Sequence, residues 1–240
     1  LQILSIVTME EPQTFEANDI HHQQEKVLEK LYIENIKEDV VYGQYTAAKD
    51  SLAYREEENV DPQSEVETFV ALKLGIDNER WKDVPIFVRT GKRMQKRSTE
   101  VVIEFKEKLG ETANLLIIRI QPDEGVYIRF NIKKPGQTNE TKTVFMDFCQ
   151  SCDYENRLNT PEAYERLLNA AMQEDHTLFA SFKQVQLSWA LAEEIIKGSK
   201  DNPIHFYEAF TNGPKAAHDL LTKDSYHWID EEVLGEVNDI

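Results

Sequence analysis

A cluster of positively charged side chains stands in the middle of an otherwise acidic sequence. The nine residues 89–97 hold five cations and no acid, namely Arg89, Lys92, Arg93, Lys96 and Arg97. The whole chain has a formal net charge of −17. Cations gathered on one turn can converge on an anion such as a phosphate, because they form charge-assisted hydrogen bonds with it. A charged run is more often a solvated surface, and the residues alone leave both interpretations open.

Two segments of alternating apolar residues flank this cluster and would position it. The alternation covers residues 84–88 before the cations and residues 101–105 after them. A period of two indicates strands, and Gly91 marks a turn between them. We therefore expect residues 84–105 to form a hairpin, in which two paired strands fix the starting points of the cations.

The two cysteines, Cys149 and Cys152, form a lone Cys-x-x-Cys pair. A structural zinc site would need two more ligands at suitable spacing, and no second pair exists in the sequence. A thioredoxin-like redox pair would follow a strand, as Cys149 does. Two reduced thiols in a cytoplasmic protein are the expectation that we adopt.

The composition excludes several classes of function. The chain has 240 residues, of which 40% are hydrophobic and 30% charged, as in ordinary globular proteins. The strong negative charge argues against general binding to nucleic acids or to an anionic membrane surface. No apolar run approaches the roughly 20 residues that a membrane-spanning helix needs.

The periodicity predicts strands in the middle of the chain and helices towards its ends. Strands are expected at 40–46, 65–74, 84–88, 101–105, 114–120, 126–132 and 143–148, and helices at 1–9, 19–31, 185–196, 216–221 and from residue 160 onwards. Short connections between successive strands imply antiparallel pairing. The predicted fold class is therefore α+β, with a large, mainly antiparallel open sheet and helices packed on one side. Because Leu1 opens inside an apolar helical pattern, we also expect a fragment of a longer chain.

Several segments, in sequence order, resemble motifs of the glucose-6-phosphate dehydrogenase family. Residues 78–92 resemble its segment N-x-R-W-x-x-V-P-x-x-x-R-x-G-K, and further matches are Val41–Tyr45 (VYGQY), Ser64–Phe69 (SEVETF), Ile118–Glu124 (IRIQPDE), Lys134–Gly136 (KPG) and Pro161–Leu167 (PEAYERL). The resemblance extends from Leu1 to about Leu221.

The resemblance implies a domain organisation. Residues 1–240 would form the carboxy-terminal substrate-side and dimerisation domain, with the tail after about residue 222 poorly defined. The amino-terminal domain that binds NADP would be absent, in agreement with the lack of a G-x-G-x-x-G fingerprint. The parent enzyme would be a cytoplasmic homodimer, paired through the sheet, that oxidises glucose 6-phosphate in the pentose phosphate pathway without a metal.

The resemblance also implies which residues meet the substrate. Lys92 matches a lysine that contacts the sugar phosphate, Arg97 falls where the family has a second basic residue, and Gln121 matches a hairpin glutamine near that site. No catalytic residue is assigned, because the family's histidine base precedes the segment that matches Leu1, and we expect the fragment alone to be inactive. Each of the six histidines is expected to be structural or solvated.

Other positions depart from the family. A second, structural NADP would need cations where this chain has Ser98 and Val102, although Arg89 and Arg119 match. Phe210 stands where the family usually has glycine, and Phe182–Gln184 departs from an acidic pattern. The alternative functions are a non-catalytic module that self-associates through its sheet and, more remotely, a nucleic-acid-binding protein.

Overall fold

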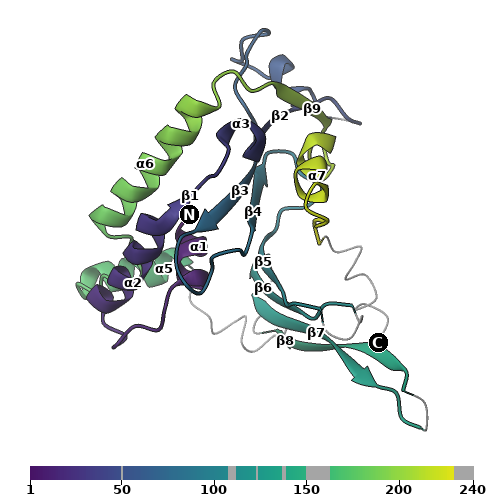
Figure 1. Ribbon diagram of the computed structural model, residues 1–240. Coiled ribbons are helices and arrows are strands. Elements are labelled where there is room, and N and C mark those ends of the chain that lie inside the picture. Colours follow the sequence, from purple (N-terminus) through teal and green to yellow (C-terminus); the bar gives the residue numbers. More distant parts are fainter. Residues whose placement is uncertain (50, 108–111, 123, 137–138, 150–162, 230–240) are drawn as a thin grey trace. The chain divides into compact units, whose positions relative to one another are not determined.

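The computed structural model describes residues 1–49, 51–107, 112–122, 124–136, 139–149 and 163–229 (Figure 1). The chain divides into two compact units. The first unit comprises Leu1–Gln95 and Glu162–His227, and the second unit comprises Lys96–Pro161 and Trp228–Ile240. Each unit is described by itself.

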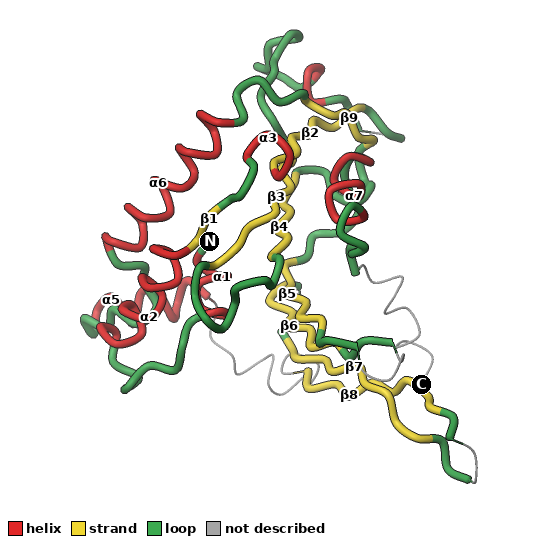
Figure 2. Tube along the Cα trace, in the orientation of Figure 1, coloured by secondary structure: helices red, strands yellow, loops and turns green. Residues whose placement is uncertain are grey.

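The first unit is built on a mixed sheet with β3 (Phe69–Ile76) at its centre (Figure 2). β3 pairs antiparallel with β1 (Leu31–Tyr32), β2 (Val40–Thr46) and β4 (Ile86–Gly91). β9 (Ile204–Glu208) pairs parallel with β2, which brings the last described strand beside an early one.

Helices of the first unit cover the sheet and build its core. Those before β3 are α1 (Gln2–Thr8), α2 (Ala17–Lys30), α3 (Ile36–Asp39) and the 3₁₀ turn η1 (Tyr54–Glu56); those later in the chain are α5 (Ala163–Met172), α6 (Phe182–Gly198) and α7 (Lys215–Thr222). Val27 and Leu28 of α2, Leu74 of β3, and Leu191 and Ile195 of α6 all belong to one buried cluster. Burial of such side chains contributes roughly 1.5–3 kcal/mol each and fixes α2 and α6 against the sheet.

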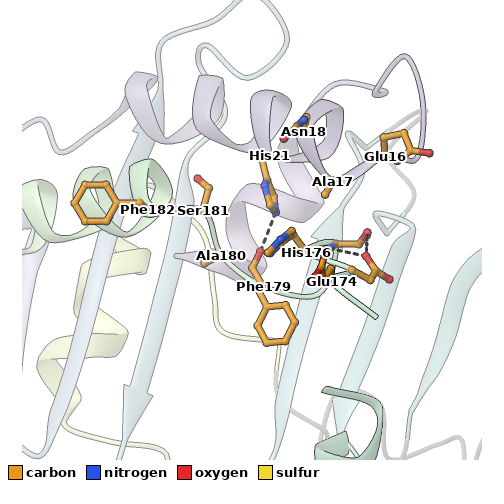
Figure 3. Close-up of a pocket in the computed structure, with 12 residues that line it drawn as sticks. Glu16, Ala17, Asn18, His21, Glu174, His176, Phe179, Ala180, Ser181 and Phe182 are labelled. Atoms are coloured by element: carbon orange, nitrogen blue, oxygen red, sulfur yellow. Dashed lines mark hydrogen bonds between the residues drawn. The ribbon is translucent and has the colours of Figure 1, made fainter. Parts of the chain in front are cut away.

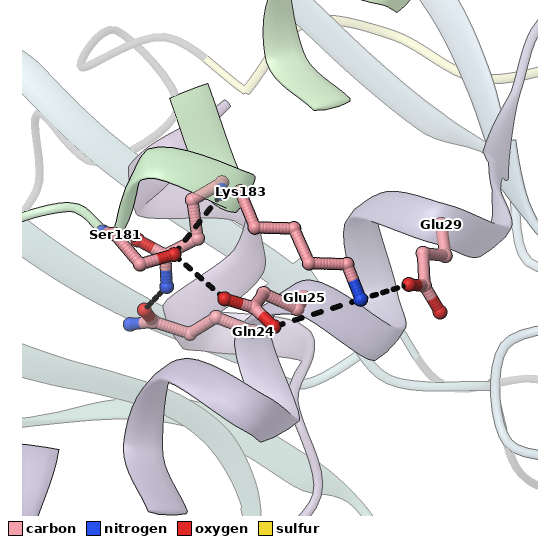
Figure 4. Close-up of polar contacts among 6 residues, drawn as sticks. Gln24, Glu25, Glu29, Ser181 and Lys183 are labelled. Carbon is pink, nitrogen blue, oxygen red and sulfur yellow. Dashed lines mark hydrogen bonds and ion pairs between the residues drawn. The ribbon is translucent and has the colours of Figure 1, made fainter. Parts of the chain in front are cut away.

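Polar contacts hold the start of α6 to α2 (Figure 4). Ser181 caps α6, since its Oγ accepts from the Gln184 amide at 3.1 Å while Gln184 Oε1 accepts from the Ser181 amide at 2.9 Å. The Ser181 hydroxyl also donates to Glu25 of α2 at 2.6 Å. Lys183 reaches Glu29 of α2 at 2.5 Å. Lys183 belongs to the segment Phe182–Gln184 that departs from the family's acidic pattern, and it forms ion pairs with acidic side chains of α2.

The second unit is a four-stranded antiparallel sheet. Its strands are β5 (Thr99–Glu104), β6 (Leu115–Gln121), β7 (Gly125–Lys133) and β8 (Thr141–Cys149), hydrogen-bonded in that order. One face carries the buried Leu115 and Ile117, against which Ile229 packs. The described residues of this unit therefore form a small core on this face.

The opposite face of the second unit is apolar, and its side chains are partly or largely exposed in the part of the chain that the structure describes. The strand register aligns Val101, Ile118, Val126 and Phe148 in one row, and Ile103, Leu116, Ile128 and Met146 in the next. Each of these side chains is partly or largely exposed, and Phe148 is 56% exposed. An apolar face of this width is a feature of protein interfaces.

The predicted fold class is confirmed, but the predicted hairpin at residues 84–105 is wrong. β4 pairs with β3, and β5 pairs with β6 in the other unit. The basic segment between them instead bonds to the segment after β9: the Phe210 amide donates to Arg93 O at 2.7 Å, and the Gln95 amide to Thr211 O at 3.0 Å. Alternation identifies a strand but does not choose its partner.

Two further expectations are corrected or fall outside the described residues. Cys149 is disulfide-bonded, so the expectation of two reduced thiols is wrong. Cys152, the helix start at Thr160–Glu162 and the end of the tail lie outside the described residues. Among the described helices, none is both long and apolar enough to cross a membrane.

Candidate functional site

Lys92 lies directly after β4, on a backbone that is anchored from two sides. Its amide donates to Thr68 O at 2.8 Å. Its carbonyl oxygen accepts from the hydroxyl of Tyr207, on β9, at 2.7 Å. The side chain is exposed, and no described residue forms an ion pair with its ammonium group. A cation on a fixed backbone with a free ammonium group is suited to binding an anion from solution.

A buried aromatic ring supports this anchored backbone. Phe69 of β3 is 2% exposed, and its ring lies 5.5 Å from that of Tyr207. A Cβ atom on Gly91 would lie 2.7 Å from the Phe69 ring, and one on Gly213 would lie 2.5 Å from it. Glycine at both positions therefore leaves room for the ring beneath Lys92.

Arg93, the next residue, is engaged elsewhere. Its backbone has a φ of +50°, in the left-handed region, and its guanidinium group lies 3.3 Å from Glu57 Oε1. The same carboxylate oxygen accepts from the Tyr45 hydroxyl at 2.7 Å. The bond from Tyr45, and next the bond from Arg93, lower the pKa of Glu57. Arg93 is thus neutralised by Glu57, whereas Lys92 is not.

Arg97 and Gln121 lie at one end of the sheet of the second unit. Gln121 is the last residue of β6 and pairs with Thr99, the first residue of β5. Arg97 precedes Thr99 by two positions, and both Arg97 and Gln121 are exposed. The structure brings Arg97 and Gln121 to the same strand end, whereas Lys92 belongs to the first unit.

Sequence reasoning did not find Tyr207, although its hydroxyl is central to the anchoring of Lys92. Tyr207 lies close to Phe210, where the sequence departs from the family pattern. Phe210 has a φ of +65°, a left-handed conformation that favours glycine, so the family's glycine suits this backbone. Residues 204–207, Ile-His-Phe-Tyr, include three residue types that favour strands, but they are too few to establish a period.

A separate cavity lies elsewhere in the first unit. About 650 Å³ lie between the start of α2 and the segment that precedes α6 (Figure 3). His21 Nε2 is 2.8 Å from Phe179 O at its wall. The lining includes Glu16, Glu174 and Asp175, and neither lysine nor arginine is among its described residues. The cavity is therefore unsuited to a phosphate.

Metal chemistry has no support in the described part of the chain. No three histidine, cysteine or carboxylate side chains gather there in a way that could hold a metal ion.

The fold defines the class of protein: an α+β domain built on two mainly antiparallel sheets, with motif residues gathered around one buried ring. A family profile described as "Glucose-6-phosphate dehydrogenase, C-terminal domain" matches residues 1–229. The chain therefore belongs to the glucose-6-phosphate dehydrogenase family, by its C-terminal domain, and the resemblance seen in the motifs is confirmed.

Curated relatives and solved structures agree with this assignment. The chain is 43% identical to the glucose-6-phosphate 1-dehydrogenase of Chlamydia trachomatis, over 95% of this chain and 55% of that protein. It is 39% identical to the enzyme of Bacillus subtilis, over 95% and 50% respectively. A structure described as "Glucose-6-phosphate dehydrogenase in complex with its substrate glucose-6-phosphate" matches with a TM-score of 0.85 at 30% identity, over 95% of this chain and 49% of that one. The chain spans about half the length of the relatives it matches.

Proposed function

We propose that this chain is the substrate-side half of an NADP-dependent glucose-6-phosphate dehydrogenase, a cytoplasmic enzyme of the pentose phosphate pathway. The complete enzyme, meaning this chain joined to an amino-terminal half of the kind its relatives have, oxidises glucose 6-phosphate to 6-phosphogluconolactone. Family membership supports the proposal. The observation that carries it is Lys92, whose backbone is bonded on both sides while its ammonium group stays open to solvent.

The side chains of this half bind the phosphate and perform no covalent step. In the reaction, the C1 carbon of the sugar loses a hydride to NADP, and the hydroxyl group on C1 loses a proton to a base. Lys92 and Arg97 supply positive charge for the phosphate dianion, and the Gln121 amide donates a hydrogen bond to the sugar phosphate. Charge-assisted hydrogen bonds of this kind are about twice as strong as neutral ones. We assign the base and the coenzyme to the amino-terminal half.

The residues of this chain do not fit a coenzyme site. The G-x-G-x-x-G fingerprint of a dinucleotide-binding turn is missing from the sequence. A structural nucleotide on the sheet would need more cations than the two that match, Arg89 and Arg119. The guanidinium carbon of Arg119 lies 4.7 Å from the centre of the Tyr127 ring. Ser98 and Val102 carry no charge. We therefore assign no NADP contact to this chain.

We also propose that two copies pair through the apolar face of the second unit. The rows headed by Val101 and Ile103 extend over four strands without a covering element in the described chain. A second copy would bury these side chains, and homodimers commonly use such self-complementary apolar surfaces.

Reconstitution tests the assignment of activity. The 240-residue chain is measured alone and after fusion to the amino-terminal half of the Bacillus subtilis relative, with NADPH formation as the readout. We expect no turnover by the chain alone and glucose 6-phosphate oxidation by the fusion. Turnover by the chain alone would contradict its role as a half-enzyme. A folded fusion that binds NADP but does not oxidise the sugar phosphate would contradict the proposed function, and persistence of the dimer in that case would favour the alternative, a self-association module.

A further inference from the structure

We infer that Tyr207 is a positioning residue: its hydroxyl holds the backbone of Lys92 in the place where the ammonium group meets the substrate phosphate. The inference rests on the proposed function of Lys92. Tyr207 itself is buried, at 4% exposure, and acts through Lys92 without touching the substrate.

The hydroxyl of Tyr207 joins two segments at the same point. It donates to Lys92 O at 2.7 Å and lies 3.2 Å from Thr68 Oγ1. Thr68 in turn accepts the Lys92 amide on its carbonyl oxygen, at 2.8 Å. In the described chain, Tyr207 is the single partner of the Lys92 carbonyl group, so its loss frees one side of the Lys92 backbone.

The ring of Tyr207 is held in turn by the sheet. Tyr207 is paired with Tyr45 in the parallel register of β9 with β2. Its ring packs against Phe69 at 5.5 Å and against Tyr45 at 6.4 Å. Burial raises the pKa of Tyr207, so the hydroxyl keeps its proton and remains a donor. The pairing of β9 with β2 and the two neighbouring rings hold Tyr207 in place. Its hydroxyl group therefore has little freedom to follow the Lys92 carbonyl oxygen if Lys92 moves.

A freed carbonyl group allows the peptide plane between Lys92 and Arg93 to rotate. Arg93 is anchored by Glu57 and has a left-handed backbone, so the displacement falls on Lys92. A shift of about 1 Å in a binding group can cost up to about a hundredfold in rate. Because Lys92 binds phosphate in the ground state and the transition state alike, the loss should appear in KM and leave kcat nearly unchanged.

A double-mutant cycle in the complete enzyme tests the inference. Tyr207→Phe removes only the hydroxyl group, and we expect the KM for glucose 6-phosphate to rise about three- to tenfold with kcat within about twofold. In a Lys92→Ala background, Tyr207→Phe should have no further effect on KM, because the group that it positions is gone. Tyr42→Phe is the matched control: it removes another partly buried hydroxyl on the same sheet, bonded to Ser199 Oγ at 2.7 Å, and should leave KM unchanged.

The outcomes separate this inference from the proposed function. An unchanged KM for Lys92→Ala overturns the phosphate contact, and the positioning role with it. A raised KM for Lys92→Ala, combined with an unchanged KM for Tyr207→Phe or with additive effects of the two substitutions, overturns the positioning role alone.

Hydrogen exchange of the Lys92 amide provides a second readout that does not depend on turnover. The amide is bonded to Thr68 O, and Tyr207→Phe should speed its exchange relative to that of the Val70 amide on β3. Equal protection of the Lys92 amide in the variant and the wild type would contradict the inference.

Discussion

Single side chains around Phe69 decide how the chain can hold Lys92. The Phe69 ring occupies space that any side chain at Gly91 or Gly213 would need. Gly213 also has a φ of +98°, which a side chain adopts only with strain. These residues therefore couple the packing of the core to the backbone of the candidate site.

Alanine at Gly213 should destabilise the first unit more than alanine at Gly91. Gly213→Ala combines a contact of 2.5 Å with a left-handed backbone, whereas Gly91→Ala brings a contact of 2.7 Å without that strain. Overpacking costs about 1–3 kcal/mol, and the backbone strain adds about 1–2 kcal/mol at Gly213. Denaturant unfolding of both variants measures the difference. If the two substitutions lower the free energy of unfolding by the same amount, a side chain at position 213 does not strain the backbone there.

The stability of the chain should fall at alkaline pH because of Tyr45. Burial, and next the bond to Glu57, raise the pKa of Tyr45 from 10.0 to about 12. Between these values the unfolded tyrosine has lost its proton while the folded one keeps it, so the free energy of unfolding decreases as pH rises through this window. Tyr45→Phe should flatten the dependence, as measured by urea unfolding at a series of pH values. A variant with the same slope as the wild type would show that Tyr45 is not the cause.

At the scale of single residues, the sequence singled out Lys92 as a candidate but did not find the residues that hold its backbone. The resemblance to the family singled out Lys92, whereas the charge pattern of the basic segment alone left both a solvated surface and an anion site open. Tyr207 is separated from Lys92 by 115 residues, and its role depends on a parallel pairing that no local pattern encodes. The engagement of Arg93 by Glu57 likewise arises only when η1 and the segment after β4 come together.

Secondary structure was predicted well where the alternation of apolar residues was clear. The strand expected at 40–46 matches β2, and those at 114–120, 126–132 and 143–148 match β6, β7 and β8 within two residues at either end. Pairing was predicted less well, since β4 and β5 do not form a hairpin. β9, β1 and α3 were missed, because short elements have too few residues to establish a period.

The apolar face of the second unit leads to a prediction about self-association. Phe148 on β8 is 56% exposed, and Trp189 on α6 is 62% exposed. If the sheet face is the interface, Phe148→Lys should dissociate the dimer by placing a charge in an apolar contact. Trp189→Lys makes the same charge change on another exposed apolar side chain and should leave the dimer intact. Sedimentation of both variants measures whether each still forms a dimer. If only Trp189→Lys dissociates, the interface lies on α6 and not on the sheet face.

On the scale of the whole molecule, the chain consists of two units that carry different candidate functional features. The first unit carries Lys92 on an anchored backbone, and the second unit carries Arg97, Gln121 and the apolar face. The chain as a whole matches about half the length of relatives named glucose-6-phosphate 1-dehydrogenase. The motifs predicted this membership from the sequence, while the division into two units required the structure.

The preference of the complete enzyme for glucose 6-phosphate over glucose tests the phosphate contact most directly. If Lys92 binds the phosphate, Lys92→Ala removes an interaction that only the phosphorylated sugar can make. A hydrogen bond to a charged group contributes about 1.5–3 kcal/mol, so kcat/KM for glucose 6-phosphate should fall about 10- to 150-fold, while kcat/KM for glucose stays constant. Lys82→Ala, which removes an exposed lysine at the other end of β4, should change neither. An equal loss for both sugars, or no loss for glucose 6-phosphate, would contradict the claim that Lys92 binds the phosphate.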